Sequence, residues 1–338
     1  MKRPVLFAMA LATLTPLLSS AAFAQVEHPK MSIGAAAATV SYVAPYLAVA
    51  KGFFKEEGVD VTIANFQGGS KALQAMMGGS VDVVIGAYGH TLTMASKGQK
   101  IRYFASFLRC PGYVVALSKG QTAKSFKDLK GLKVGVTAPG SSTHQGFNYL
   151  MGRAGLAPDS YTPIAVGNSA GSVAATKYGK VDANVIVEPI VSLLQAGNDA
   201  TLLMDGRTEE KSREAFGGPF PEGGLYARED FIKKNPRTIQ ALANGLVRAN
   251  EWLQTASPAD VAATVPEGFL LGDKAIYEKS FEGIRETISP DGMMPPGAQE
   301  NCLKFLADAD PKIAADRAKI KLEDTWTNEF ALRAKKHA

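Results

Sequence analysis

The chain has 338 residues, with 37 Lys and Arg against 32 Asp and Glu and a formal net charge of +5. It contains only two cysteines and four histidines, and the histidines are too scattered to match the ligand spacing of a metal site. No stretch rich in Lys and Arg is interleaved with aromatic residues. We therefore expect no metal, no cofactor and no nucleic-acid partner.

The first 24 residues have the composition of a secretory signal peptide. Lys2 and Arg3 precede an apolar run over 5–18, and the small residues at 22–24 allow cleavage after Ala24. A transmembrane anchor is the alternative, but the run is shorter than the ~20 apolar residues that span a bilayer. No cysteine lies near the cleavage site to carry a lipid. We expect an exported, freely diffusing periplasmic protein.

After this leader, short β-branched runs alternate with longer helical stretches, which is typical of parallel sheets covered by helices. We expect strands at 31–35, 60–65, 81–86 and 101–107, with helices at 45–57 and 71–77. A second series has strands at 133–137, 162–166 and 183–187, with helices at 143–154 and 170–178. A strand at 225–228 follows, and then a helical apolar stripe from Phe231 to Trp252.

The second series repeats the first at a nearly fixed offset. Tyr46-Leu47 matches Tyr149-Leu150 at an offset of 103, and Val81-Asp82 matches Val181-Asp182 at an offset of 100. Chance agreement is the alternative, because the lengths of strands, helices and turns are narrowly distributed. We interpret the offset as two similar α/β lobes.

The first lobe is expected to be discontinuous, because its own helices are too few to cover both faces of its sheet. The C-terminal helices would return to it, so that lobe I comprises 25–115 and 226–338 and lobe II comprises 116–225. The chain would cross between the lobes near 112–118 and near 222–228.

A series of stretches, in the same order along the chain, resembles the solute-binding proteins of ABC importers for sulfonates, taurine, nitrate and thiamine-precursor pyrimidines. The resemblance extends over about 33–252 and rests on 45–54, 58–61, 68–70, 79–84, 127–136, 179–183 and Glu188-Pro189. It implies a type II periplasmic-binding-protein fold, with two Rossmann-like lobes, mixed sheets and two hinge crossovers. It also implies that the lobes close over a small polar ligand, such as a sulfonate, nitrate, aromatic carboxylate or pyrimidine. A permease in the inner membrane would be the partner, and we expect a monomer.

Ligands of open α/β sheets bind at the carboxyl ends of the strands, beside helix N-termini. The loops at these positions give our candidate binding residues, which are Thr39, Ser41, Tyr42, Gly69, Ser70, Tyr88 and His90 in lobe I and Ser141, Ser142, Thr143, Asn168 and Glu188 in lobe II.

Three of these candidates have an equally simple structural interpretation. Ser70 could cap its own helix, and His90 could be a packed loop residue. Glu188 ends an apolar strand, so it could accept hydrogen bonds from a ligand or form a salt bridge at the hinge. A carboxylate in the cleft would argue against a simple oxyanion as ligand.

Two enzyme functions are alternatives to solute binding. Gly167 to Gly171 matches the G-x-S-x-G nucleophile elbow of α/β-hydrolases, which would make the chain a secreted hydrolase, but the only histidine after Ser169 is His337, in the tail. The pyrimidine synthases that share the fold carry a cysteine-rich motif, whereas this chain has only Cys110 and Cys302. Those two cysteines could pair or could be buried separately. We therefore expect no catalytic residues.

Overall fold

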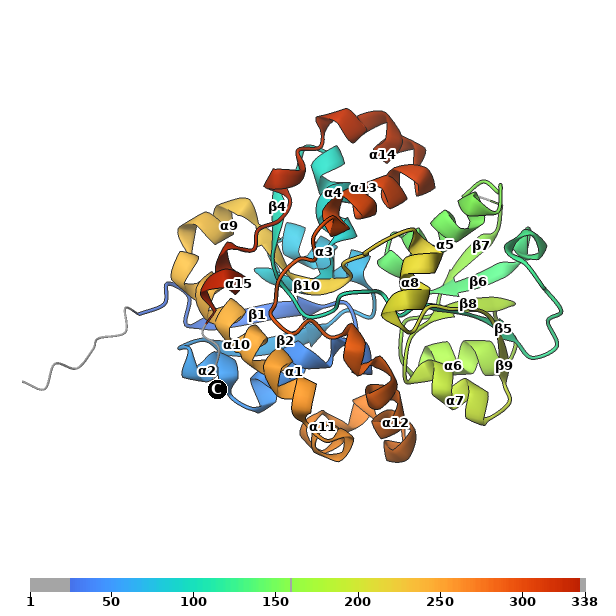
Figure 1. Cartoon of the computed structure of the whole chain (residues 1–338), viewed down its shortest axis with the longest axis horizontal. Coiled ribbons are helices and arrows are strands. Elements are labelled where there is room, and N and C mark those ends of the chain that lie inside the picture. Colours follow the sequence, from blue (N-terminus) through green and yellow to red (C-terminus); the bar gives the residue numbers. More distant parts are fainter. Residues whose placement is uncertain (1–24, 159, 335–338) are drawn as a thin grey trace, which may run out of the picture.

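The computed structural model describes residues 25–158 and 160–334. The expected leader and its cleavage site after Ala24 lie outside the described residues. Within these ranges, no helix combines the length and the hydropathy needed to cross a bilayer. Figure 1 shows two sheets side by side, each with helices on its faces.

Each sheet has five strands, and the two sheets share one topology. The lobe I sheet has the order β2-β1-β3-β10-β4, and the lobe II sheet has the order β7-β6-β8-β5-β9. The strands of lobe I are β1 (Lys30–Ala35), β2 (Asp60–Asn65), β3 (Val83–Ala87), β4 (Ile101–Ser106) and β10 (Gly223–Arg228). Those of lobe II are β5 (Val114–Ser118), β6 (Lys133–Val136), β7 (Thr162–Ala165), β8 (Ala183–Ile186) and β9 (Ala200–Asp205). This confirms the expected type II periplasmic-binding-protein fold.

One strand in each sheet runs against its neighbours. β1 pairs parallel with β2 and β3, while β10 lies antiparallel between β3 and β4. β6 likewise pairs parallel with β7 and β8, while β5 lies antiparallel between β8 and β9. The chain therefore passes between the sheets over 107–113 and 206–222.

The sequence pattern missed two strands, β5 and β9. The stretch expected to be the first crossing, 112–118, contains β5, and the second, 222–228, contains β10. The lobe boundaries expected at 115/116 and 225/226 accordingly fall inside these two strands. A short, fully buried run such as Val114–Ser118 shows no alternation, so periodicity alone does not identify it as a strand.

Fifteen α-helices and six 3₁₀ helices accompany the strands in the described ranges. In the first half they are η1 (Val40–Tyr42), α1 (Val43–Ala50), α2 (Phe53–Glu56), α3 (Gly69–Met77), α4 (Gly89–Ser96), η2 (Phe126–Leu129) and α5 (Ser142–Arg153). Next come α6 (Ala170–Lys177), α7 (Ile190–Ala196), α8 (Glu209–Phe216), α9 (Glu229–Lys234), α10 (Pro236–Thr255) and α11 (Pro258–Thr264). The remainder are η3 (Glu267–Phe269), α12 (Lys274–Ile284), η4 (Arg285–Thr287), α13 (Ala298–Ala309), α14 (Pro311–Asp316), η5 (Arg317–Lys319), η6 (Leu322–Asp324) and α15 (Glu329–Arg333).

The single helix expected at 45–57 is two helices, α1 and α2. Gly52 lies between them with φ of +75°, a left-handed conformation that glycine adopts at little cost and that ends a helix.

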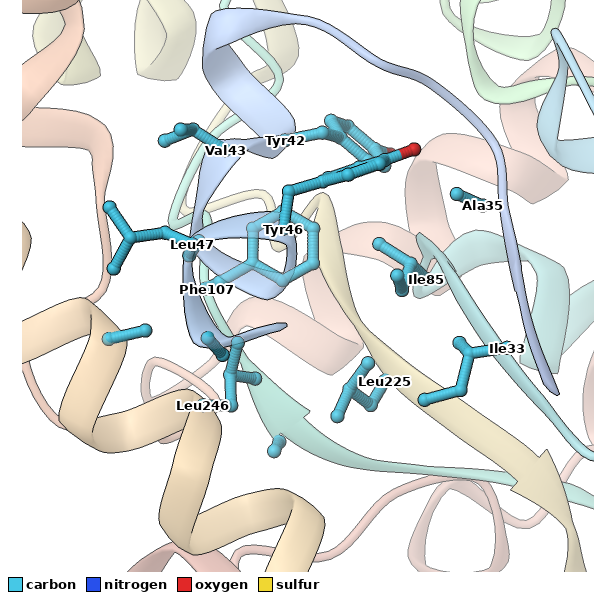
Figure 2. Packing of buried hydrophobic residues seen from close by; sticks show 14 of the residues in the cluster. Ile33, Ala35, Tyr42, Val43, Tyr46, Leu47, Ile85, Phe107, Leu225 and Leu246 are labelled. Carbon is cyan, nitrogen blue, oxygen red and sulfur yellow. The ribbon is translucent and has the colours of Figure 1, made fainter. Parts of the chain in front are cut away.

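The C-terminal helices pack against elements of both lobes. α10 packs on α1 and α2, and α15 packs on α10 and β4, so these helices cover the lobe I sheet. Figure 2 shows Leu246 of α10 and Leu47 of α1 beside Ile33, Ile85 and Leu225 of that sheet. α13 instead contacts α4 of lobe I and α5 of lobe II, and its Phe305 joins an apolar cluster with residues from both lobes.

Candidate functional site

A cavity of about 40 Å³ lies between the two sheets at the ends of their strands. Both lobes and both crossovers contribute to its wall. The lining residues are Ala36, Ala37, Thr39, Ser41, Tyr42, Gly69, Pro111, Tyr113, Thr137, Ser142, Thr143, Asn168, Val187 and Glu222. We call this the interlobe cavity.

Seven of the candidate binding residues line this cavity, and the remaining five do not. The seven are Thr39, Ser41, Tyr42, Gly69, Ser142, Thr143 and Asn168. The five outside its wall are Ser70, Tyr88, His90, Ser141 and Glu188. The strand-end rule therefore located the cavity without identifying every side chain that faces it.

Glu222 is the most unusual residue of the cavity, and the sequence pattern missed it. Its carboxylate is 2% exposed. Oε1 accepts a hydrogen bond of 2.6 Å from the Tyr113 hydroxyl and a longer one of 3.5 Å from the Tyr42 hydroxyl. Oε2 has no hydrogen-bond partner among the described residues. Burial raises the pKa of Glu222 to about 7, although the hydrogen bonds from Tyr113 and Tyr42 oppose this increase.

Tyr113 and Glu222 were missed for the same reason. They immediately precede β5 and β10, the strands that run antiparallel within their sheets. Because β5 and β10 run in the opposite direction to their neighbours, their N-terminal ends lie beside the carboxyl ends of those neighbouring strands. A search confined to residues that follow strands omits both positions. The sequence signal that could have identified Glu222 is its position as an acidic residue inside a Pro- and Gly-rich segment.

Two helix N-termini also face the cavity. α3 begins at Gly69 and α5 begins at Ser142, and neither helix is capped by the side chain of its own N-cap residue. Helix N-termini carry a partial positive charge and free N–H groups. Among the residues that the structure describes, no Lys or Arg lines the cavity. Its wall therefore combines one buried carboxylate with hydroxyls and helix N-termini.

Ser70 and Ser141 connect the lobes directly. Ser141 occupies the N-cap position of α5, but its Oγ accepts the backbone N–H of Ser70 in lobe I at 3.2 Å. The Ser70 Oγ donates to the carbonyl oxygen of Pro139 in lobe II at 2.9 Å. Asn168 adds a third bond, from Nδ2 to the carbonyl of Ala36 at 3.1 Å. The lobes therefore touch around the cavity.

Glycines allow this close contact between the lobes. A Cβ on Gly68 would lie 2.9 Å from the Cβ of Ala138, and a Cβ on Gly167 would lie 3.0 Å from Oε1 of Gln67. Both glycines have positive φ, at +155° and +68°. A side chain at either position would hold the lobes apart.

His90 and Tyr88 lie behind the wall of the cavity. The His90 Nδ1 is 3.0 Å from the Tyr226 hydroxyl, and its ring packs against Gly69, where a Cβ would come within 2.4 Å of Cε1. Burial lowers the pKa of His90 to about 4. The Tyr88 hydroxyl is 2.7 Å from Oγ1 of Thr325. His90 and Ser70 also line a second space of about 520 Å³, which is bordered by α3 and α4 of lobe I, by α5 of lobe II and by α13.

Glu188 forms an ion pair at the hinge, which is one of its two expected interpretations. Its Oε1 lies 2.7 Å from Nη1 of Arg207, in the second crossover. Its two oxygens also accept hydrogen bonds from Ser192 of α7 and Ser280 of α12. The carboxylate therefore joins lobe II to the crossover and to a C-terminal helix.

The residues that could have formed a disulfide, a hydrolase triad or a metal site are not brought together among the described residues. Cys110 and Cys302 are both buried and are not paired. Ser169 of the G-x-S-x-G stretch occupies the N-cap position of α6, and His337 lies outside the described residues. Within the described ranges, no group of three His, Cys, Asp or Glu side chains could hold a metal ion.

The chain is similar to a known protein family and to several solved structures. The model of the "NMT1/THI5 like" family matches residues 40–259. A solved structure of the Bordetella bronchiseptica protein CAE31940 is 44% identical, with a TM-score of 0.89, and the match covers 91% of this chain and 98% of that one. The alkanesulfonate-binding protein SsuA of Xanthomonas axonopodis, solved with bound MOPS, is 20% identical, with a TM-score of 0.67 and coverage of 88% and 98%.

An enzyme is also similar in sequence. The 4-amino-5-hydroxymethyl-2-methylpyrimidine phosphate synthase THI13 of Saccharomyces cerevisiae is 26% identical over 227 residues. That match covers 64% of this chain and 64% of the yeast protein, so the chain spans less than two thirds of the synthase.

Proposed function

The chain belongs to the NMT1/THI5-like family, and we propose that it is the periplasmic solute-binding component of an ABC importer. The expected signal peptide at 1–24 would export it without a lipid anchor. It would bind a small polar molecule between its lobes and deliver it, as a monomer, to a permease in the inner membrane. The observation that carries this proposal is the interlobe cavity, whose wall comes from both lobes and contains a buried carboxylate.

The buried Glu222 carboxylate supports a ligand that donates hydrogen bonds. A buried charge is costly unless it is paired or hydrogen-bonded, and Oε2 has no such partner among the described residues. An amine, amidine or ring amino group would supply the missing donor and would stabilise the ionised carboxylate.

The rest of the cavity wall supports an acceptor or acidic group on the same ligand. The N-termini of α3 and α5 present backbone N–H groups there, and the hydroxyls of Thr39, Ser142 and Thr143 are nearby in the wall. A ligand that carries both an N–H donor and an acceptor or acidic group fits this wall. An aminopyrimidine is therefore favoured over nitrate or a simple sulfonate.

The geometry also suggests how binding would be linked to closure. Ligand held by one lobe would gain contacts from the second lobe only when the lobes meet, which stabilises the closed form by differential affinity. The bonds that Ser70 makes to Ser141 and Pro139 would then add to closure.

Calorimetry with matched compounds tests the ligand class. We expect aminopyrimidines to bind and the corresponding compounds without the amino group to bind at least about tenfold more weakly, because one charge-assisted hydrogen bond is lost. Glu222→Gln should remove that preference, with Glu282→Gln, an exposed carboxylate, as control. Tight binding of nitrate or of an N–H-free sulfonate would contradict the proposed ligand class.

A synthase is the second candidate function, because of the similarity to the yeast enzyme. The cysteine-rich motif expected of such synthases is absent, since the sequence has only Cys110 and Cys302. Incubation of the purified protein with a bound ligand, followed by mass spectrometry of that ligand, distinguishes the two functions. Recovery of the ligand unchanged supports binding, and conversion to a pyrimidine phosphate supports the synthase.

A further inference from the structure

A separate groove, of about 650 Å³, lies on lobe II and shares no lining residue with the interlobe cavity. It is bordered by η2, the C-terminal end of α5, the edge strand β9 and α8. Its lining residues are Lys124, Ser125, Phe126, Lys127, Leu150, Arg153, Ala154, Leu203, Met204 and Ala215. We call it the η2 groove.

The floor of the η2 groove is apolar and partly exposed. Phe126, Leu203 and Met204 are each only half-buried, and they pack on the apolar cluster beneath them. A β-bulge contributes to this arrangement, because Val115 pairs with Met204 and Ala116 with Leu202. Leu203 is thus the extra residue of the bulge, so that two consecutive side chains of β9 line the same groove.

The rim of the η2 groove is basic. Lys124, Lys127 and Arg153 are all exposed, and the ion pairs found elsewhere in this lobe use other basic residues. The Arg153 Nη1 donates to the carbonyls of Glu214 and Ala215, which fixes this guanidinium at the rim.

The acidic side chain of η2, Asp128, accepts hydrogen bonds at the start of its own helix. Asp128 accepts hydrogen bonds from the backbone N–H groups of Lys124 and Ser125 and from the Ser125 hydroxyl. These bonds are those of a capping box at the start of η2, and they lower the pKa of Asp128. No salt bridge among the described residues of this lobe uses Lys124, Lys127 or Arg153, so the positive charge of the rim is available to a partner.

We propose that the η2 groove binds an acidic, partly apolar peptide segment of the membrane protein that receives the solute. This rests on the proposed function. An apolar floor inside a charged rim is the arrangement of a protein interface, and three separated cations fit carboxylates that flank apolar side chains. The groove therefore provides a docking surface that is separate from the solute.

The test uses fluorescence anisotropy with the full chain and a labelled synthetic peptide rich in Glu and Leu. The matched probe replaces every Glu by Gln. We expect the acidic peptide to bind in a salt-dependent manner, and the Lys124→Glu/Lys127→Glu variant to bind it about tenfold more weakly. The matched control is Lys119→Glu/Lys180→Glu, which reverses two exposed lysines of lobe II outside the groove.

Three results would overturn this assignment: equal binding of the Gln peptide, equal losses in the two double variants, or binding of anionic phosphatidylglycerol vesicles without binding of the peptide. Calorimetry of the Lys124→Glu/Lys127→Glu variant with solute separates this proposal from the proposed function. Retained solute binding with lost peptide binding supports the groove, whereas a wild-type chain that binds no solute counts against the proposed function alone.

Discussion

The Tyr113 hydroxyl donates a 2.6 Å hydrogen bond to Oε1 of Glu222 and thereby joins the ends of the two crossovers. Tyr113 is the last residue of the first crossover, before β5, and Glu222 is the last residue of the second crossover, before β10. The carboxylate that we propose to contact the ligand is therefore held by the segments about which the lobes would move. If the proposed site is correct, occupation of the cavity would be coupled to the position of the hinge at this pair.

Stability should depend on pH through Glu222. Its pKa is raised from 4.5 to about 7, so the folded state binds more protons than the unfolded state between these values. The free energy of unfolding should therefore fall by about 3 kcal/mol as pH rises through this window. Denaturant titrations at several pH values should show this fall in the wild type and its loss in Glu222→Gln. An unchanged pH dependence in the variant would place the titration elsewhere.

Removal of the Ser70 hydroxyl should weaken solute binding without unfolding the protein. The bond from Ser70 to the Pro139 carbonyl connects the lobes, and a bond of this kind contributes about 1 kcal/mol. Ser70→Ala should raise the solute Kd about fivefold and leave Tm near the wild-type value. Ser96→Ala, which removes a bond within α4, is the control and should leave Kd unchanged. Equal Kd values for the two variants would contradict a closing role for Ser70.

A methyl group at Gly69 should collide with the His90 ring. The added Cβ would lie 2.4 Å from Cε1, and overpacking of this kind costs about 1–3 kcal/mol. Gly69→Ala should therefore lower the free energy of unfolding, and the double variant with His90→Ala should recover part of that loss. Additive effects of the two substitutions in a double-mutant cycle would show that the two residues do not interact.

Arg207→Ala should destabilise the hinge. It would leave the Glu188 carboxylate, whose side chain is 4% exposed, without its cation, and loss of one partner from a buried pair costs about 3 kcal/mol. The control is Arg213→Ala, which breaks an exposed pair with Glu209 and should cost less than about 1 kcal/mol. Denaturant unfolding compares the two directly, and similar losses would count against a structural role for Glu188.

The sequence predicted those parts of the molecule in which parallel strands alternate with helices. Strands β1, β2, β6 and β7 lie close to their expected positions, because each is bounded by turn residues and followed by a helical pattern. β5 and β9 were missed, since β5 is buried along its whole length and β9 carries a bulge that breaks the alternation.

The same limitation governs the candidate site. Thr39, Asn168 and the 142–143 turn follow parallel strands and were found by that rule. Glu222 and Tyr113 precede antiparallel strands, whose direction follows from tertiary pairing and not from local pattern. Whether Glu188 contacts ligand or Arg207 likewise depends on residues distant in sequence, which local reasoning left open.

The exchange of β5 and β10 between the two sheets has a consequence for how the polypeptide acquires its structure. Residues 83–87 complete their hydrogen bonding only when 223–228 arrive, after the whole of the lobe II sheet has been synthesised. Loop closure over such a separation is slow, so the N-terminal part cannot reach its final form early in synthesis. A nascent chain of this topology would complete its first sheet late, which would suit the export that we propose for it.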